Sequence, residues 1–105
     1  MSTMKVILTT CNPKDAPELV EQLLGARLVG CGNILKGIDS MYWWNGEIQR
    51  DPEALILMET TDEQCKAAMH RLTEIHPYDV PKILAFEPTD ALDAYRQWLI
   101  QETTP

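Results

Sequence analysis

The residues with the most suggestive chemistry in this sequence lie in the segment EIHPYDVPKIL, residues 74–84. His76 follows an apolar helical pattern and precedes two prolines, so it should end a helix and begin a stiff corner. An imidazole there can cap the helix, because the helix dipole favours a protonated ring, or it can bind copper, zinc or nickel. A general base would need an oriented partner and a nucleophile, and the sequence nominates neither.

Cys11 is a second candidate ligand, because it closes the first strand pattern and ligands often bind where the strands of open sheets end. The expected fold brings this strand end near residues 76–78, and a thiolate with an imidazole selects soft or borderline metals. We therefore predict His76 and Cys11 as metal ligands, with a third ligand from a carboxylate, water or a second subunit. Cys31 and Cys65 are expected to be small buried residues, because three cysteines without a C-x-x-C spacing suit neither disulfides nor a zinc finger.

Composition and charge exclude several classes of protein. The 105 residues are 45% apolar with a net charge of −7, and they suit a single globular domain spanning residues 1–105. Such an acidic chain lacks the Lys and Arg clusters that bind nucleic acid. Apolar runs are too short for a membrane span or a signal peptide, so we expect a reduced, cytoplasmic protein. Phosphate loops and hydrolase motifs are absent from the sequence, so we do not expect an enzyme.

Strand and helix patterns must position these residues, and apolar periodicity predicts four strands and three helices. They comprise strands at residues 5–10, 33–44, 54–60 and 82–86, a helix at 16–28, a helix capped by Thr60 or Thr61 and stopped by Pro77, and a helix opened by Thr89 or Asp90. The order βαββαβ with an added helix predicts an α+β, ferredoxin-like fold. Its second and third strands should form a long hairpin, and its extra helix is C-terminal.

The hairpin pattern is the most legible of these. Asn45-Gly46 suits a type I′ turn, which would place Trp44 opposite Glu47. Pro52 predicts a bulge or an edge nearby. Strict alternation puts two sets of side chains on opposite faces: Ile34, Ile38, Tyr42 and Trp44 on one, and Leu35, Met41 and Trp43 on the other.

Apolar residues occur on both faces of the predicted strands, although a ferredoxin-like sheet has helices on one face only. Exposed apolar patches usually mark interfaces, so we predict self-association through the free sheet face and the hairpin. Tyr42, Trp43 and Trp44 crowd the hairpin with few basic residues between them. Packing in a core or between subunits therefore explains them better than stacking on nucleic acid.

Several segments taken together resemble one known family over nearly the whole chain. In order, they are ARLVGCGNILKGIDSMYWWNGEI, ILMETT, HPYDVPKILAF and AYRQWL. With this order and spacing, the sequence resembles the CutA family of divalent-cation tolerance proteins. The resemblance implies a ferredoxin-like subunit in a tight homotrimer, similar in architecture to PII signalling proteins. It also implies a binding module with no obligatory cofactor and a role in tolerance of divalent metals, notably copper(II).

The resemblance also assigns residues. It implies a ligand cleft at Tyr78, Glu59 and Asn33, and a trimer interface at Tyr42, Trp43, Trp44 and Trp98. Copper-binding members have a His-His pair, and Ile75 occupies its first position here. Glu59 stands where the family usually has lysine. The set of copper ligands implied by the resemblance is therefore incomplete. The cation expected to bind is copper(II) or another divalent ion.

Two functions follow as alternatives. The first is a trimer whose inter-subunit clefts bind a metal ion or a small ligand in the response to metals. The second is a PII-like allosteric module that binds a metabolite and signals through its hairpins. Neither alternative involves nucleic acid or a membrane.

Overall fold

The computed structural model describes residues 3–104. This part of the chain contains four strands and three α-helices. In chain order they are β1 (Met4–Cys11), α1 (Ala16–Gly25), β2 (Cys31–Trp44), β3 (Glu47–Thr61), α2 (Asp62–Ile75), β4 (Ile83–Phe86) and α3 (Asp93–Glu102). All strand pairs are antiparallel, in the order β2-β3-β1-β4. The predicted α+β, ferredoxin-like fold with a long hairpin and a C-terminal helix is confirmed.

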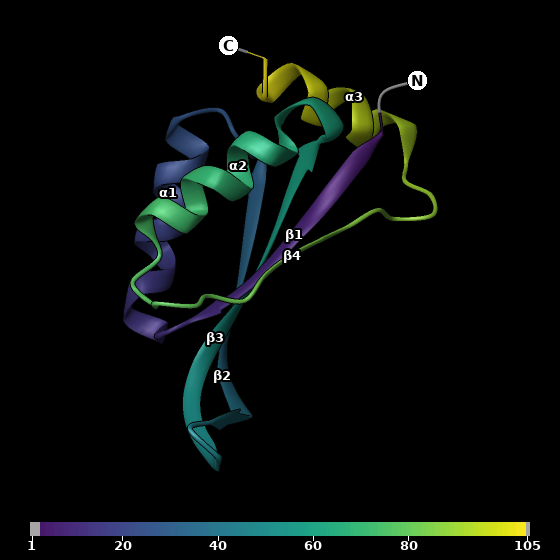
Figure 1. Cartoon of the computed structure of the whole chain (residues 1–105). Coiled ribbons are helices and arrows are strands. Elements are labelled where there is room, and N and C mark those ends of the chain that lie inside the picture. The colour runs from purple at the N-terminus through teal and green to yellow at the C-terminus, as the bar shows by residue number, and fades with distance from the viewer. Residues whose placement is uncertain (1–2, 105) are drawn as a thin grey trace.

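The core lies between the sheet and two helices. α1 and α2 lie side by side on one face of the sheet, and α3 lies at the end where β1 begins (Figure 1). Ile7, Ile56 and Met58 of the sheet and Leu23 and Leu72 of the helices are completely buried. Each such side chain stabilises the fold by about 1.5–3 kcal/mol relative to an exposed one. The periodic apolar residues of the sequence therefore hold these two layers together.

The opposite face of the sheet, here called the open face, carries large apolar side chains that α1 and α2 do not cover. Alternation along the paired strands directs Val6, Leu8, Leu35, Leu55, Leu57, Leu84 and Phe86 to this side. Leu35, Leu84 and Phe86 are 47–60% exposed. The predicted second apolar face of the sheet is therefore present.

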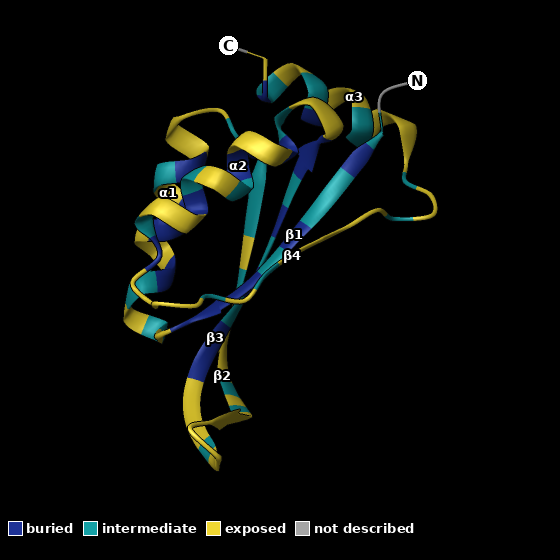
Figure 2. Ribbon diagram, in the orientation of Figure 1, coloured by how far each residue is buried: buried dark blue, intermediate teal, exposed yellow. Residues whose placement is uncertain are grey.

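The hairpin of β2 and β3 extends past the rest of the sheet as a two-stranded arm, residues 38–53 (Figure 1). Asn45 and Gly46 both have positive φ, 51° and 79°, as the predicted type I′ turn requires, and Trp44 pairs with Glu47. Most of the arm is exposed, as Figure 2 shows. The molecule is accordingly elongated, at 45 × 26 × 22 Å.

A bulge in β2 corrects the predicted grouping of side chains. The register slips between Leu35 and Ile38, and Gly37 has φ of 77°. Ile34 therefore faces the helices, whereas Ile38, Tyr42 and Trp44 share the side of the open face. Met41 and Trp43 lie on the opposite side of the arm from Leu35. The irregularity expected near Pro52 lies in the facing strand, and Pro52 itself pairs with Asp39 on the arm, where β3 has a neighbour on one side only.

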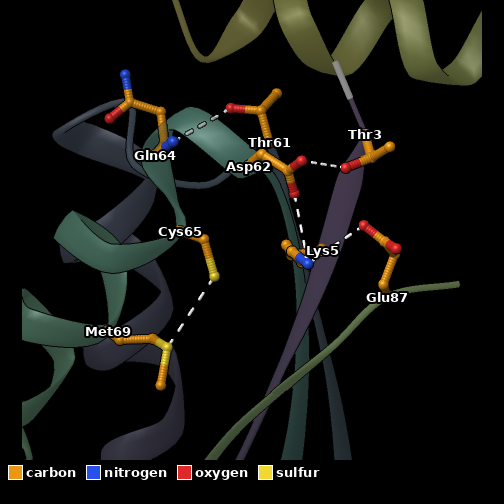
Figure 3. Close-up of polar contacts among 8 residues, drawn as sticks. All are labelled: Thr3, Lys5, Thr61, Asp62, Gln64, Cys65, Met69 and Glu87. Atoms are coloured by element: carbon orange, nitrogen blue, oxygen red, sulfur yellow. Dashed lines mark hydrogen bonds and ion pairs between the residues drawn. The ribbon is translucent and has the colours of Figure 1, made fainter. Parts of the chain in front are cut away.

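Polar contacts fix the start of α2. Thr61, one of the two predicted caps, accepts a hydrogen bond from the backbone N–H of Gln64 at 3.4 Å (Figure 3). Asp62 accepts one from the Thr3 hydroxyl, and Lys5 Nζ lies 3.6 Å from Asp62 and 3.2 Å from Glu87. These contacts connect β1, the start of α2 and the segment after β4. Within residues 3–104, no helix has the length and apolar character needed to span a membrane.

Candidate functional site

The corner after α2 begins at His76, the C-cap residue of the helix. Its backbone N–H donates to the Leu72 carbonyl at 2.9 Å, and its extended backbone turns the chain out of the helix before Pro77. The side chain is only 6% exposed, so the imidazole belongs to the interior. The prediction that His76 ends a helix and opens a corner is confirmed.

Both ring nitrogens of His76 contact backbone groups. Nε2 lies 2.9 Å from the Thr10 carbonyl oxygen, and Nδ1 lies 3.2 Å from the backbone nitrogen of Tyr78. A carbonyl oxygen can only accept, so Nε2 carries the proton, and Nδ1 accepts from the Tyr78 N–H. This neutral tautomer satisfies both contacts and leaves no ring lone pair for a metal ion in this arrangement.

The next residue of the corner, Tyr78, bonds to a buried carboxylate. Its hydroxyl donates to Glu53 Oε2 at 2.6 Å, and Glu53, on β3, is 6% exposed. The Tyr78 ring also lies against the His76 ring, with centroids 4.8 Å apart. Burial, together with the hydrogen bond to Glu53, raises the pKa of Tyr78 well above its usual range. The hydroxyl therefore stays protonated and donates.

A second carboxylate bonded to a tyrosine lies beside the first. Tyr42 on β2 donates to Asp51, which is two residues from Glu53 and on the same side of β3. This bond is the main cause that raises the pKa of Tyr42, and the negative charge of Glu53 adds to it. We call Tyr42, Asp51, Glu53 and Tyr78 the carboxylate–tyrosine cluster. It concentrates negative charge and oxygen donors where the arm leaves the sheet.

Cys11 lies at the end of β1, as predicted, next to the Thr10 carbonyl that contacts His76. Its side chain is fully buried, and burial raises the pKa of the thiol to about 11, with smaller effects from Asp15 and Glu53. A metal ligand must be a thiolate, so this cysteine would have to lose a proton that its surroundings retain.

The predicted metal pair therefore does not fit a metal ion as the chain is arranged. Both ring nitrogens of His76 are engaged, and burial raises the pKa of the Cys11 thiol. Ile75, which occupies the first position of the histidine pair expected from the resemblance, packs against the core. Among residues 3–104, no group of three or more His, Cys, Asp or Glu side chains could hold a metal ion.

The other predicted cleft residues lie toward the opposite end of the sheet. Glu59 accepts a hydrogen bond from the Tyr95 hydroxyl of α3 at 2.8 Å, and it pairs across the sheet with Cys31. Cys31 Sγ lies 3.8 Å from Asn33 Oδ1. Cys31 is thus half-buried among polar groups, not in the apolar interior as expected, whereas Cys65 is buried.

One chain does not bring the predicted cleft together. Tyr78 donates a hydrogen bond to Glu53, and Glu59 lies six positions further along β3, about 20 Å from Glu53. Asn33 lies at the Glu59 end. A cleft that contains Tyr78, Glu59 and Asn33 therefore requires two chains.

The predicted interface residues are all at the surface of the single chain. Tyr42 and Trp44 lie on one side of the arm, and Trp43 lies on the other. Trp98 of α3 stacks on Tyr95, with ring centroids 5.5 Å apart. All four predicted interface side chains are 41–71% exposed.

Sequence reasoning missed Asp51 and Glu53. Alternation from the core residue Ala54 would have placed Glu53 on the open side, but nothing in the sequence indicates that it is buried. Its burial depends on Tyr78, which is 25 residues away in the chain.

The chain is similar in sequence to a family of known proteins. Residues 4–102 match the family model described as CutA1 divalent ion tolerance protein. The divalent-cation tolerance protein CutA of Pyrococcus horikoshii is 36% identical over 100 residues, covering 93% of this chain and 97% of the relative. The corresponding Thermus thermophilus protein is 34% identical over 98 residues, covering 93% and 95%.

Solved structures agree with this match. The divalent ion tolerance protein CutA1 from Ehrlichia chaffeensis superposes with a TM-score of 0.95 at 34% identity, covering 100% of this chain and 99% of that chain. CutA1 from Oryza sativa superposes with a TM-score of 0.92 at 30% identity, covering 97% and 94%. The likeness therefore extends over sheet, helices and arm.

Proposed function

This chain belongs to the family of CutA1 divalent ion tolerance proteins, and from that premise we propose that it is a cytoplasmic homotrimer that binds a divalent cation or a small ligand between its subunits. Tolerance of divalent cations is the function that the family name describes. The trimer, the clefts and copper(II) as one such cation are the proposed parts. Its three cysteines are all free, which suits a reducing compartment.

The observation that carries the proposal is the extent of apolar surface on the open face and the arm. Leu84 and Phe86 are about half exposed on the open face, and Trp43 is 71% exposed on the arm. Exposed apolar surface of this kind is characteristic of an interface. A second copy of the chain is a suitable occupant, because it offers equally apolar surface.

The shape of the arm favours a ring of three chains over a symmetric dimer. Tyr42 and Trp44 lie on one side, and Met41, Trp43 and Ile48 lie on the other. An arm with two apolar sides fits between two different neighbours, and head-to-tail contacts supply two neighbours when they close into a ring. Three is the smallest number of chains in which each has two different neighbours.

A ring of three chains would also form the proposed cleft. Head-to-tail contact would set the Tyr78 end of one subunit against the Glu59 and Asn33 end of the next, which is what a shared site requires. His76 and Cys11 lie beside this cleft, and each would bind a metal only after giving up a hydrogen bond or a proton.

The mass of the assembly in solution tests the proposal. Light scattering at micromolar concentration should give three times the 11.9-kDa mass of the chain. Leu84→Glu, which places a charge on the open face, should yield single chains. Leu24→Glu is the matched control, because Leu24 is exposed on α1, away from the open face, and this variant should remain trimeric.

Ligand binding separates the two alternatives. Equilibrium dialysis against Cu²⁺ or Mn²⁺ should show binding to the trimer and loss of binding in Leu84→Glu. A trimer that binds no divalent cation but retains a metabolite from cell extract would favour the PII-like module. A folded wild-type chain that stays single at micromolar concentration would contradict the proposal altogether.

A further inference from the structure

The turn at the tip of the arm contains the one asparagine–glycine step of the sequence, Asn45-Gly46. We propose that Asn45 is a site of spontaneous modification, at which its side-chain amide reacts with the backbone nitrogen of Gly46 and the residue becomes aspartyl or isoaspartyl. Asparagine is a thermolabile residue, and this reaction needs no enzyme. The arm would therefore change chemically with the age of the chain.

The tip of the arm leaves the reacting groups accessible. Asn45 and Gly46 are both exposed, and the arm extends away from the layered core (Figure 2). Gly46 has no Cβ, and the space beside it is open, since a Cβ there would meet no atom within 4 Å. Within residues 3–104, the Gly46 N–H makes no backbone hydrogen bond. The attacking nitrogen is therefore neither shielded by a side chain of its own residue nor held by a backbone partner.

The other two asparagines of the chain lack these conditions. Asn12 precedes Pro13, which has no N–H to lose. Asn33 precedes the β-branched Ile34 and lies in the paired part of β2, where the ladder holds the backbone. Asn45 alone combines an accessible amide with an unhindered nitrogen.

The reaction balances with water as its only co-reactant. The Gly46 nitrogen bonds to Cγ of Asn45, and the bond from Cγ to Nδ2 breaks, so that ammonia leaves with the proton of the Gly46 N–H. The product is a cyclic succinimide. Water then opens the ring at Cγ to give aspartyl, or at the backbone carbonyl carbon of Asn45 to give isoaspartyl, in which the main chain runs through Cγ.

The turn must open locally before the ring can close. A type I′ turn, shown here by the φ of 51° at Asn45, places Cβ of that residue and the nitrogen of Gly46 on opposite sides of the Cα–C bond. The ring needs them on the same side. A two-stranded ribbon has marginal stability by itself, and such segments open at a small cost in free energy. The reaction should therefore proceed in the native protein, more slowly than in an unfolded chain.

The two products should affect the arm differently. Aspartyl leaves the main chain unchanged, and Asp-Gly suits the same turn, so the hairpin should persist with one more negative charge beside Glu47. Isoaspartyl lengthens the main chain by one atom between Trp44 and Glu47, which pair directly across the two-residue turn. The turn cannot accept this atom without moving its ends, so isoaspartyl should loosen the arm.

Peptide mapping of the wild-type protein tests the proposal. After incubation of the native protein at mildly alkaline pH, trypsin releases the peptide 37–50, in which Asn45 is the sole asparagine. The mass of this peptide should rise by one dalton in a growing fraction of chains, and fragmentation should place the change at Asn45 and not at Gln49. The peptides that contain Asn12 and Asn33 should stay unchanged. An unincubated sample digested alongside corrects for conversion during digestion.

Asn45→Gly is the matched control, because Gly-Gly suits the same turn and has no side-chain amide to react. Hydrogen exchange of residues 38–53, measured by mass spectrometry, should become faster when wild-type protein is incubated and should stay constant in this variant. Asn45→Asp adds the charge with the main chain intact, so fresh samples of this variant should exchange like fresh wild-type protein.

An Asn45 that stays intact in the native protein would overturn the inference, and its conversion in a urea-unfolded sample over the same time would identify the hairpin as what prevents the reaction. Hydrogen exchange that rises as much in Asn45→Gly as in the wild-type protein would overturn the proposed loosening of the arm. Both results would leave the proposed function standing, because the reaction takes place within one chain.

Discussion

All three tyrosines of the chain share one arrangement, in which the hydroxyl donates to a carboxylate on the same side of β3. The pairs are Tyr42 with Asp51, Tyr78 with Glu53 and Tyr95 with Glu59. Ionisation of any of them would place two negative charges within hydrogen-bond distance, and the pKa of each is raised. At the residue scale, β3 therefore carries a row of carboxylates that accept hydrogen bonds from tyrosines on β2, the corner after α2 and α3.

Residue-scale prediction from sequence succeeded where a signal was local. Pro77 follows His76 directly, so the end of the helix could be inferred. The bond from Tyr78 to Glu53 crosses 25 positions and depends on how β3 is registered in the sheet, which no short pattern encodes. The contact of the His76 ring could not be predicted for the same reason, because the Thr10 carbonyl comes from β1.

The tyrosine pairs predict a loss of stability at alkaline pH. A folded pKa above the unfolded value of about 10 means that the unfolded chain releases the proton first. The stabilisation is therefore complete below pH about 10 and falls as pH rises toward the higher folded values. Near-ultraviolet absorbance of the native protein should show little tyrosinate at pH about 10, and Tyr78→Phe should make thermal stability less sensitive to pH above this value. Half-ionisation of native tyrosine near pH 10 would contradict the arrangement.

At the scale of the elements, periodic patterns predicted each strand and helix but not the points where the backbone leaves ordinary geometry. α1 ends at Gly25, three residues before the predicted end, because Arg27 has φ of 61° and turns the chain. α3 begins at Asp93, later than predicted. The bulge in β2 reversed the expected sides of the arm, and its one sequence sign, Gly37, is ambiguous within a strand.

Gly37 provides a test of the bulge. Its φ of 77° is unfavourable for any residue with a Cβ, although a Cβ there would meet no atom within 4 Å. Gly37→Ala should therefore cost about 1–2 kcal/mol in free energy of unfolding, through backbone strain alone. Urea unfolding followed by circular dichroism measures this cost.

Gly25→Ala is the matched control for that measurement. A Cβ at Gly25 also meets no atom within 4 Å, and this residue ends α1 without a positive φ. Alanine there should be neutral or stabilising by up to about 1 kcal/mol. Equal effects at the two positions would show that the bulge does not require a left-handed residue.

At the scale of the whole molecule, the chain presents a layered core on one side and apolar surface on the other. The sequence indicated both, because Ile56 and Met58 alternate with Leu55 and Leu57 along β3 and all four are apolar. It could not indicate how neighbouring chains sit, since the pattern of one strand specifies a face and not an orientation. The cleft shared between subunits is accordingly proposed, because it depends on how neighbouring chains are oriented.

Charge predicts how the proposed trimer responds to salt. Each chain carries −7, so three chains repel one another while apolar contacts hold them together. Raising salt from roughly 10 mM to roughly 1 M shortens the Debye length from about 30 Å to about 3 Å. The concentration at which the trimer separates on dilution should therefore fall, as measured by light scattering. Weaker association at high salt would show that ion pairs hold the subunits.

The arm has a further consequence for how much of this protein a cell contains. A two-stranded ribbon has marginal stability by itself, and on a newly made chain it leaves Trp43 and Ile48 exposed to water until the other chains of the proposed trimer bind. Chaperones and proteases act on such exposed segments. Chains that fail to meet others would be cleared, so steady-state abundance should climb more steeply than gene dosage, and halving synthesis should remove more than half of the protein.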